Sequence, residues 1–203
     1  MSNITGLRSA TLNDVEVIAK IHVQCWREVY GFMPREVHDM RDLSYRRNQW
    51  NCWFKERPDL EAFFVLLHND NVVGFAISKP NHDDAIDALG EFHACYILPE
   101  FRGGQAGPMA MMALALSLKE NNLWPACVWA FKQNPYRRIY PMLGCRPLVY
   151  RDRSIGGADI PEIGYHISDY NALMSRLDRM RVSAEKRQIE LPQKLVRQSR
   201  LVG

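Results

Sequence analysis

The chain has 203 residues, of which 47% are hydrophobic and 24% charged, and its formal net charge is +3. This composition is typical of one folded domain and excludes a mainly disordered chain. No apolar run reaches the ~18 residues that a membrane-spanning helix requires, and polar residues interrupt the first twenty positions, unlike a signal peptide. We therefore expect a cytoplasmic protein that does not associate with a membrane.

The positive charge is concentrated near the C-terminus. Residues 1–168 contain 18 Lys and Arg against 19 Asp and Glu, whereas residues 169–203 contain 8 against 4. The basic residues are interspersed with acidic ones and form no continuous patch, so we do not expect nucleic-acid binding. The five cysteines are widely spaced in mostly apolar segments, as reduced core cysteines usually are, and we expect no metal site.

The first third of the chain predicts a strand followed by helices. A short strand is expected over residues 7–10, after which Thr11 and Asp14 resemble a helix-capping box. Apolar residues then recur at helical spacing over residues 15–29. A second helical region is expected within residues 34–54, where the many aromatic side chains either fill a core or form the wall of a substrate pocket.

Strands dominate the middle of the chain. Residues 61–78 predict two strands joined by turn-forming residues at 68–71, and residues 90–98 predict another strand. A glycine-rich loop then leads into a helix over residues 112–118, and a strand follows at residues 126–131.

The last part of the domain predicts a helix and two strands. Asn134 is a good helix cap, and Gly144 can end that helix in a left-handed conformation. Strands are expected at residues 145–151 and 161–167, with a loop formed by the nine residues between them. The order of elements predicts one mixed α/β domain over residues 1–168.

Residues 169–203 predict a basic, amphipathic helical tail. Its apolar residues at helical spacing are Tyr170, Leu173, Met174, Leu177 and Met180. Pro192 is expected to interrupt the weaker basic segment beyond them. The tail either packs on the core, mediates a homodimer or contacts another partner, and the sequence leaves these alternatives open.

The glycine-rich loop, RGGQAG at residues 102–107, indicates an anion site. Glycines allow backbone amides to approach a phosphate closely, and a helix N-terminus adds partial positive charge. The spacing matches neither the G-x-G-x-x-G dinucleotide motif nor the phosphate loop of nucleotide triphosphatases. The loop therefore indicates a phosphate site of another type.

Two motifs resemble the GNAT superfamily of N-acetyltransferases. The run "ILPEFRGGQAG" resembles the R/Q-x-x-G-x-G/A acyl-CoA signature of that family, with Arg102 and Gly107 in its first and last slots. The run "NPYRRIYPMLGCRPL" is similar to a second signature, in which Asn134 opens a helix and Tyr140 follows about two turns later. The first residues are also similar, so the resemblance covers roughly residues 5–168.

The resemblance implies an α/β fold with a single mixed, mostly antiparallel central sheet flanked by helices. The two middle strands splay apart in that fold and admit the pantetheine arm of acetyl-CoA, the implied co-substrate. The implied cofactor-binding residues lie on the strand beside that arm, on the glycine-rich loop and at the start of the following helix. They are Tyr96, Ile97, Leu98, Arg102, Gly103, Gly104, Gln105, Ala106, Gly107, Asn134 and Arg137.

Acetylation of an amine requires a base, because a lysine-like amine with a pKa near ~10.4 is mostly protonated at neutral pH. The resemblance implies Glu91 in this role, eleven residues before Arg102, and burial would raise its pKa. His93 shares the strand face of Glu91 and is an alternative base or part of a water relay. Tyr140 takes the slot of the acid that protonates the leaving thiolate. Each of the three also has a structural interpretation, as an ion-paired, hydrogen-bonded or core residue.

The sequence thus predicts an N-acetyltransferase that moves the acetyl group of acetyl-CoA directly to a primary amine. The acceptor is a small-molecule amine or a peptide amine, and family members usually build its pocket from the segments that correspond to residues 30–54 and 152–161. The alternative is a catalytically degenerate GNAT fold that serves as an acyl-CoA-binding or protein-interaction module.

Three departures from the family pattern support that alternative. Gln105 stands where the family usually has its central glycine, and Pro108 lacks an amide hydrogen. Tyr140 follows Asn134 by six positions, where seven is the common spacing.

Overall fold

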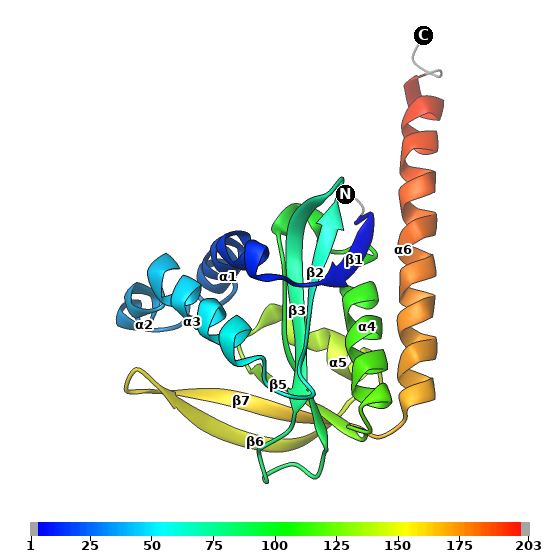
Figure 1. Cartoon of the computed structure of the whole chain (residues 1–203). Coiled ribbons are helices and arrows are strands. Elements are labelled where there is room, and N and C mark those ends of the chain that lie inside the picture. The colour runs from blue at the N-terminus through cyan, green and yellow to red at the C-terminus, as the bar shows by residue number, and fades with distance from the viewer. Residues whose placement is uncertain (1–3, 200–203) are drawn as a thin grey trace.

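The computed structural model describes residues 4–199, and the side chains of residues 4–187. Seven strands form one sheet in the order β1-β2-β3-β4-β5-β7-β6 (Figure 1). Every neighbouring pair is antiparallel except β4 and β5, which are parallel. The predicted mixed, mostly antiparallel sheet is confirmed.

Helices and strands alternate along the chain much as the sequence predicts. The strands are β1 (Gly6–Ser9), β2 (Ala62–His68), β3 (Asn71–Pro80), β4 (Gly90–Ile97), β5 (Ala126–Phe131), β6 (Arg146–Ile155) and β7 (Ala158–Ile167). The helices are α1 (Val15–Val29), α2 (Arg35–Met40), α3 (Leu43–Glu56), α4 (Ala106–Glu120), α5 (Ile139–Met142) and α6 (Tyr170–Ser199). Short 3₁₀ turns are η1 (Leu12–Asp14), η2 (Pro99–Phe101) and η3 (Pro135–Arg138). None of the helices within residues 4–199 is long and apolar enough to span a bilayer.

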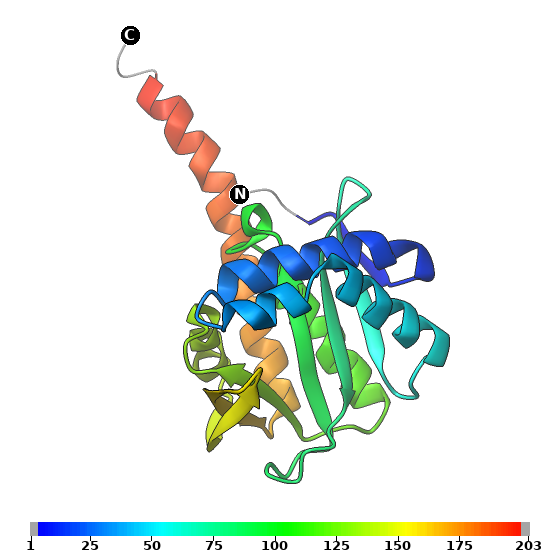
Figure 2. The same cartoon turned by 90° about the vertical axis from the view of Figure 1, so that its left-hand side faces the viewer.

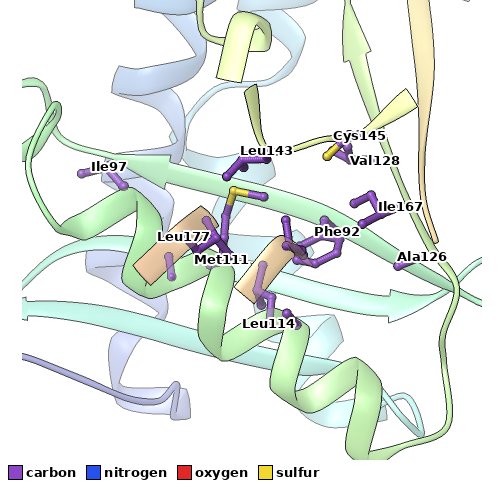
Figure 3. Close-up of a cluster of buried hydrophobic side chains, with 14 of the residues drawn as sticks. Phe92, Ile97, Met111, Leu114, Ala126, Val128, Leu143, Cys145, Ile167 and Leu177 are labelled. Carbon is purple, nitrogen blue, oxygen red and sulfur yellow. The ribbon is translucent and has the colours of Figure 1, made fainter. Parts of the chain in front are cut away.

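Helices cover both faces of the sheet. Figure 2 shows α1 and α3 in front of the strands, and α4 lies behind them. Because β3 is covered on both sides, its residues 73–78 are all buried. On the α4 face, Met111 and Leu114 pack near Phe92 of β4 and Leu177 of α6 (Figure 3). The sheet therefore separates two apolar cores.

The helix after β7 is integrated into the α4 core. Leu173 and Leu177 of α6 have no exposed surface and belong to the same cluster as Leu114 of α4. This position explains why α4 is apolar on nearly all sides, since it lies between the sheet and α6. Beyond its packed first turns, α6 projects away from the body (Figures 1 and 2).

The middle of the sheet is open at one end. β4 and β5 pair only at Gly90–Ala126 and Glu91–Cys127, although β4 continues to Ile97 and β5 to Phe131. The predicted splaying of the middle strands is confirmed.

A β-bulge lies on β4 where this opening begins. Ser78 of β3 pairs with Phe92, and the next residue, Ile77, pairs with Ala94, so His93 is the extra residue. A bulge re-aims the side chains on its strand. The alternation of faces along β4 is therefore shifted at His93.

The helical region predicted within residues 34–54 is confirmed as two helices, and Asp42 caps the second, α3, by accepting a hydrogen bond from the Tyr45 amide at 2.8 Å. Two predicted features of secondary structure are wrong. The loop expected between residues 151 and 161 is reduced to Gly156 and Gly157, whose φ of +58° and +80° suits a tight hairpin turn. The α6 backbone remains helical past Pro192, since an interior proline removes one hydrogen bond without having to end a helix.

Candidate functional site

A cavity of about 480 Å³ opens where β4 and β5 separate. Its walls come from α1, β4, the glycine-rich loop, α4, β5, η3, α5 and α6. Of the residues predicted from the sequence, nine line it: His93, Tyr96, Ile97, Arg102, Gly103, Gly104, Gly107, Asn134 and Tyr140. Residues far apart in the chain are thus brought together at the opening in the sheet.

Five predicted residues do not line this cavity: Glu91, Leu98, Gln105, Ala106 and Arg137. The Leu98 amide donates to the Val73 carbonyl at 3.0 Å, and Ala106 is buried in the core. Arg137 donates through Nε to the Lys132 carbonyl at 2.7 Å, which ties its guanidinium to its own loop. Oε1 of Glu91 lies 2.7 Å from Nδ1 of His93, which does line the cavity.

The glycine-rich loop offers unpaired amides at the start of a helix. Gly103 has a left-handed φ of +73°, which favours glycine. The amides of Gly103, Gly104 and Gln105 donate no hydrogen bond to any other described group. Because α4 begins directly after them, its N-terminal partial charge adds to the anion-binding capacity of the loop.

The two unusual residues of this loop fit its backbone. Gln105 has φ −78° and ψ −18°, an ordinary helical conformation, so no glycine is required there. Pro108 is the third residue of α4, where an amide has no partner within the helix. At Gly107, an added Cβ would meet no protein atom within 4 Å. The loop is therefore intact, and Gly107 faces open space.

The Arg102 guanidinium is fully engaged with the protein. It donates to the Ile97 carbonyl at 2.6 Å, to the Tyr136 hydroxyl at 2.9 Å and to both carboxylate oxygens of Glu28. Burial lowers its pKa, but the Glu28 and Tyr136 hydrogen bonds outweigh burial and raise the pKa above its usual value. Arg102 therefore lines the cavity while its side chain links the loop to Glu28 of α1 and Tyr136 of η3.

Glu91 and His93 form a hydrogen-bonded pair at the narrow end of the opening. Nδ1 of His93 lies 2.7 Å from Oε1 of Glu91, and Nζ of Lys79 lies 3.6 Å from Oε2. The Glu91 side chain is 12% exposed and that of His93 is 43% exposed. Burial raises the pKa of Glu91, but the hydrogen bond from His93 and the charges of His93 and Lys79 outweigh burial and lower the pKa overall. The raised pKa expected from the sequence is wrong for this reason.

Tyr140 and Asn134 line the same cavity despite their unusual spacing. The Asn134 side chain caps η3 by accepting from the Tyr136 amide at 2.9 Å. η3 covers only Pro135–Arg138, and Tyr140 is the second residue of α5, which follows directly, so residues at both ends of this short helical segment line the cavity. Burial raises the pKa of the Tyr140 hydroxyl, which therefore stays protonated.

An aromatic and cationic region adjoins the cavity on the α1 side. The hairpin tip at Gly156 leaves no room for a Cβ beside Val37 of α2, and residues from both segments share a small core with Trp26. The guanidinium carbons of Arg41 and Arg46 lie 4.8 and 5.0 Å from the Trp26 ring centre. The two segments from which an acceptor pocket is expected therefore meet here.

Several cavity residues escape analysis of the sequence alone. Trp129 of β5 lies under the Arg151 guanidinium at 3.8 Å, and Cys25 and Cys95 also line the cavity. Met180 and Arg187 reach it from α6. Alternation along β5 is a signal for Trp129, but no motif marks a residue that arrives from a helix in the C-terminal tail.

Residues 16–141 match the model of the acetyltransferase (GNAT) family. This match spans more than half of the chain, and it agrees with the opened sheet and the glycine-rich loop. The chain belongs to the GNAT acetyltransferase family.

Several known proteins are similar to this chain. The "Uncharacterized N-acetyltransferase YuaI" of Bacillus subtilis (strain 168) is 28% identical over 174 residues, which cover 85% of this chain and 98% of that protein. The ribosomal-protein-alanine N-acetyltransferase of Brucella melitensis has a similar structure, with a TM-score of 0.64 and 17% identity, and the match covers 81% of this chain and 99% of that chain. The yncA protein of Salmonella typhimurium also has a similar structure, with a TM-score of 0.60 and 16% identity, and the match covers 80% of this chain and 92% of that chain. These structural likenesses show a shared fold.

Proposed function

We propose that the protein transfers the acetyl group of acetyl-CoA directly to a primary amine. The observation that carries this proposal is the cavity between β4 and β5, with unpaired loop amides at the start of α4. The yncA structure is described with acetyl-CoA as its cofactor, which supports the same ligand for this cavity. Gly103, Gly104 and Gln105 would hold the pyrophosphate, and Gly107 leaves space beside it.

His93 is the proposed proton acceptor, with Glu91 as the group that orients it. His93 lines the cavity, whereas Glu91 does not line it and forms a hydrogen bond with Nδ1 of His93. Because Nδ1 donates to the carboxylate, Nε2 is left free to accept a proton from the amine, directly or through a water. The amine nitrogen then forms a bond to the thioester carbonyl carbon, and the carbon–sulfur bond breaks.

Tyr140 is the proposed acid that meets the leaving sulfur. Its hydroxyl is protonated and lies on the cavity wall near the start of α5. A hydroxyl with a pKa above that of a thiol can donate a hydrogen bond as charge develops on sulfur. Tyr140 would then protonate the CoA thiolate.

The state of the cavity cysteines favours direct transfer over an acetyl-cysteine intermediate. Such an intermediate requires a thiolate nucleophile. Desolvation at the cavity wall raises the pKa of the Cys95 thiol to about 12, although this residue is exposed toward the cavity, and burial raises the pKa of the Cys25 thiol. Both thiols are therefore protonated at neutral pH.

An assay of CoA release tests this proposal. The protein is incubated with acetyl-CoA and a panel of small primary amines and peptides, and the free thiol is measured with a disulfide reagent while mass spectrometry detects the acetylated amine. Tyr140→Phe should lower kcat more than it lowers acetyl-CoA affinity. Tyr150→Phe, on an exposed residue of β6, is the matched control.

The outcomes separate the enzyme from a non-catalytic module. Amine-dependent thiol release that Tyr140→Phe slows supports the proposal. Acetyl-CoA binding by calorimetry without transfer to any amine would favour an acyl-CoA-binding module, and no binding at millimolar acetyl-CoA would contradict both.

A further inference from the structure

A wall of the cavity comes from outside the part of the chain that matches the family. The family match ends at residue 141, whereas Met180 and Arg187 of α6 line the cavity together with Gly103, Gly104 and Met111. The glycine-rich loop and the distant C-terminal helix therefore face the same space.

Packing on α4 fixes the position of this part of α6. Leu173 and Leu177 are fully buried, and Ala184 is 2% exposed. Arg187 follows Ala184 by three residues, which is less than one helical turn. The backbone that carries Arg187 is thus held against the domain close to the cavity.

Arg187 places a cation at this wall. Its side chain is exposed, and it forms no ion pair with any carboxylate whose side chain the structure describes. By contrast, the charge of Arg102 is compensated by Glu28, and Arg137 is tied to the Lys132 carbonyl. The charge of Arg102 is therefore neutralised and Arg137 does not line the cavity, whereas Arg187 lines it without an ion pair to any described carboxylate.

We propose that Arg187 binds a phosphate group of the CoA moiety, so that α6 forms part of the cofactor site. This inference rests on the proposed function. A guanidinium and a phosphate form charge-assisted hydrogen bonds, and the five donors of arginine suit phosphate oxygens. Both the pyrophosphate and the 3′-phosphate of CoA present such oxygens, and titration with two ligands distinguishes between these two groups.

Calorimetric titration of the full-length protein with acetyl-CoA and with 3′-dephospho-CoA tests this inference. Arg187→Ala should weaken acetyl-CoA binding by about tenfold or more, as expected for a lost charge-assisted hydrogen bond. Lys186→Ala removes one charge from the same turn of α6 but not from the cavity wall, and it should weaken binding much less. Circular dichroism verifies that both variants fold.

The comparison of ligands identifies the phosphate. If Arg187→Ala has no effect on 3′-dephospho-CoA binding, Arg187 contacts the 3′-phosphate. If the loss persists, it contacts the pyrophosphate. The inference is overturned if Arg187→Ala binds acetyl-CoA as tightly as the wild type, or is weakened only as much as Lys186→Ala. Failure of the wild type to bind acetyl-CoA would instead overturn the proposed function, and this inference with it.

Discussion

His93 and Glu91 are joined by a hydrogen bond of 2.7 Å, and only His93 lines the cavity. This arrangement follows from the bulge on β4, which makes His93 the unpaired residue of the strand. This geometry supports the proposal that two side chains, which the sequence presents as alternatives for one task, have different tasks.

Replacement of His93 should therefore reduce turnover more than replacement of Glu91. We expect His93→Ala to lower kcat by about 100-fold or more and Glu91→Gln by about tenfold, with little change in acetyl-CoA affinity. Because its pKa is lowered, Glu91 is ionised throughout the neutral range, and Glu91→Gln removes a fixed charge rather than a titration step near pH 7. Profiles of kcat against pH check this, with Glu120→Gln on exposed α4 surface as the control. A larger loss in Glu91→Gln than in His93→Ala would make Glu91 the base.

Filling the space beside Gly107 should block the cofactor without unfolding the protein. A Cβ at Gly107 meets no protein atom within 4 Å, and this position lines the cavity. Gly107→Val should weaken acetyl-CoA binding by more than about tenfold, while the unfolding temperature stays the same or rises, since glycine is unfavourable in a helix. Gly6→Val in β1, where a Cβ also meets nothing, is the control. Unchanged affinity in Gly107→Val would place the cofactor elsewhere.

Asp14 should stabilise the domain at neutral pH and cease to do so in acid. The hydrogen bond from Arg8 lowers the pKa of this buried carboxyl to about 2. Burial acts in the opposite direction and raises the pKa, whereas hydrogen bonds from Thr11 lower it further. A carboxyl whose pKa is lower in the folded state stabilises that state fully when the pH is above the pKa of the unfolded chain, which is near ~3.9 for aspartate. This stabilisation is lost as the pH falls toward 2. Asp14→Asn should lower the free energy of unfolding by about 1–2 kcal/mol at pH 7.

Urea denaturation of Asp14→Asn at pH 7 and near pH 3 measures this effect. The difference from the wild type should shrink at the lower pH. Glu16→Gln, which removes an exposed ion pair with Arg47, should change the free energy little. An equal difference at both pH values would show that the charge of Asp14 is not the cause.

The cationic region beside Trp26 should favour acceptors with an acidic group. Arg41 and Arg46 both lie against this ring, and neither forms an ion pair with a described carboxylate. Burial lowers the pKa of Arg46 to about 10, so it is still charged at neutral pH. Among amines matched in shape, such as phenylalanine and 2-phenylethylamine, we expect the carboxylate-bearing amine to have the higher kcat/KM.

Arg41→Met, at a partly exposed residue, should reduce that preference by about tenfold. Arg47→Met removes an arginine that is already paired with Glu16 and should leave the preference unchanged. A wild-type preference for the neutral amine would contradict this prediction.

Motifs in the sequence were sufficient to predict the fold and the position of the glycine-rich loop before α4. The turns around Gly103 and Asn134 are local conformations, and residues nearby in the sequence determine them. The position of the Arg102 side chain instead depends on its ion pair with Glu28, which is 74 residues away in the sequence. The wall formed by Arg187 likewise depends on how α6 packs on α4, and no local pattern records that packing.

A β-bulge and a tight turn explain the remaining differences between the predicted and the observed structure. The bulge at His93 changes the alternation along β4, and its hydrogen bond with Glu91 reverses the expected direction of the Glu91 pKa. Two adjacent glycines, Gly156 and Gly157, convert a predicted nine-residue loop into a tight turn between long strands. The bulge depends on strand pairing, which the sequence does not display, whereas the adjacent glycines are a hairpin signal that the sequence does contain.

The bond between Arg102 and Glu28 has a consequence for how this protein can diverge. Glu28 does not line the cavity, yet it holds the side chain of Arg102, the first residue of the glycine-rich loop. A change at Glu28 would leave a half-buried cation uncompensated in that loop. Relatives that lose the acid at this position are therefore expected to have replaced the arginine too, so that two sites on separate segments are inherited as a pair.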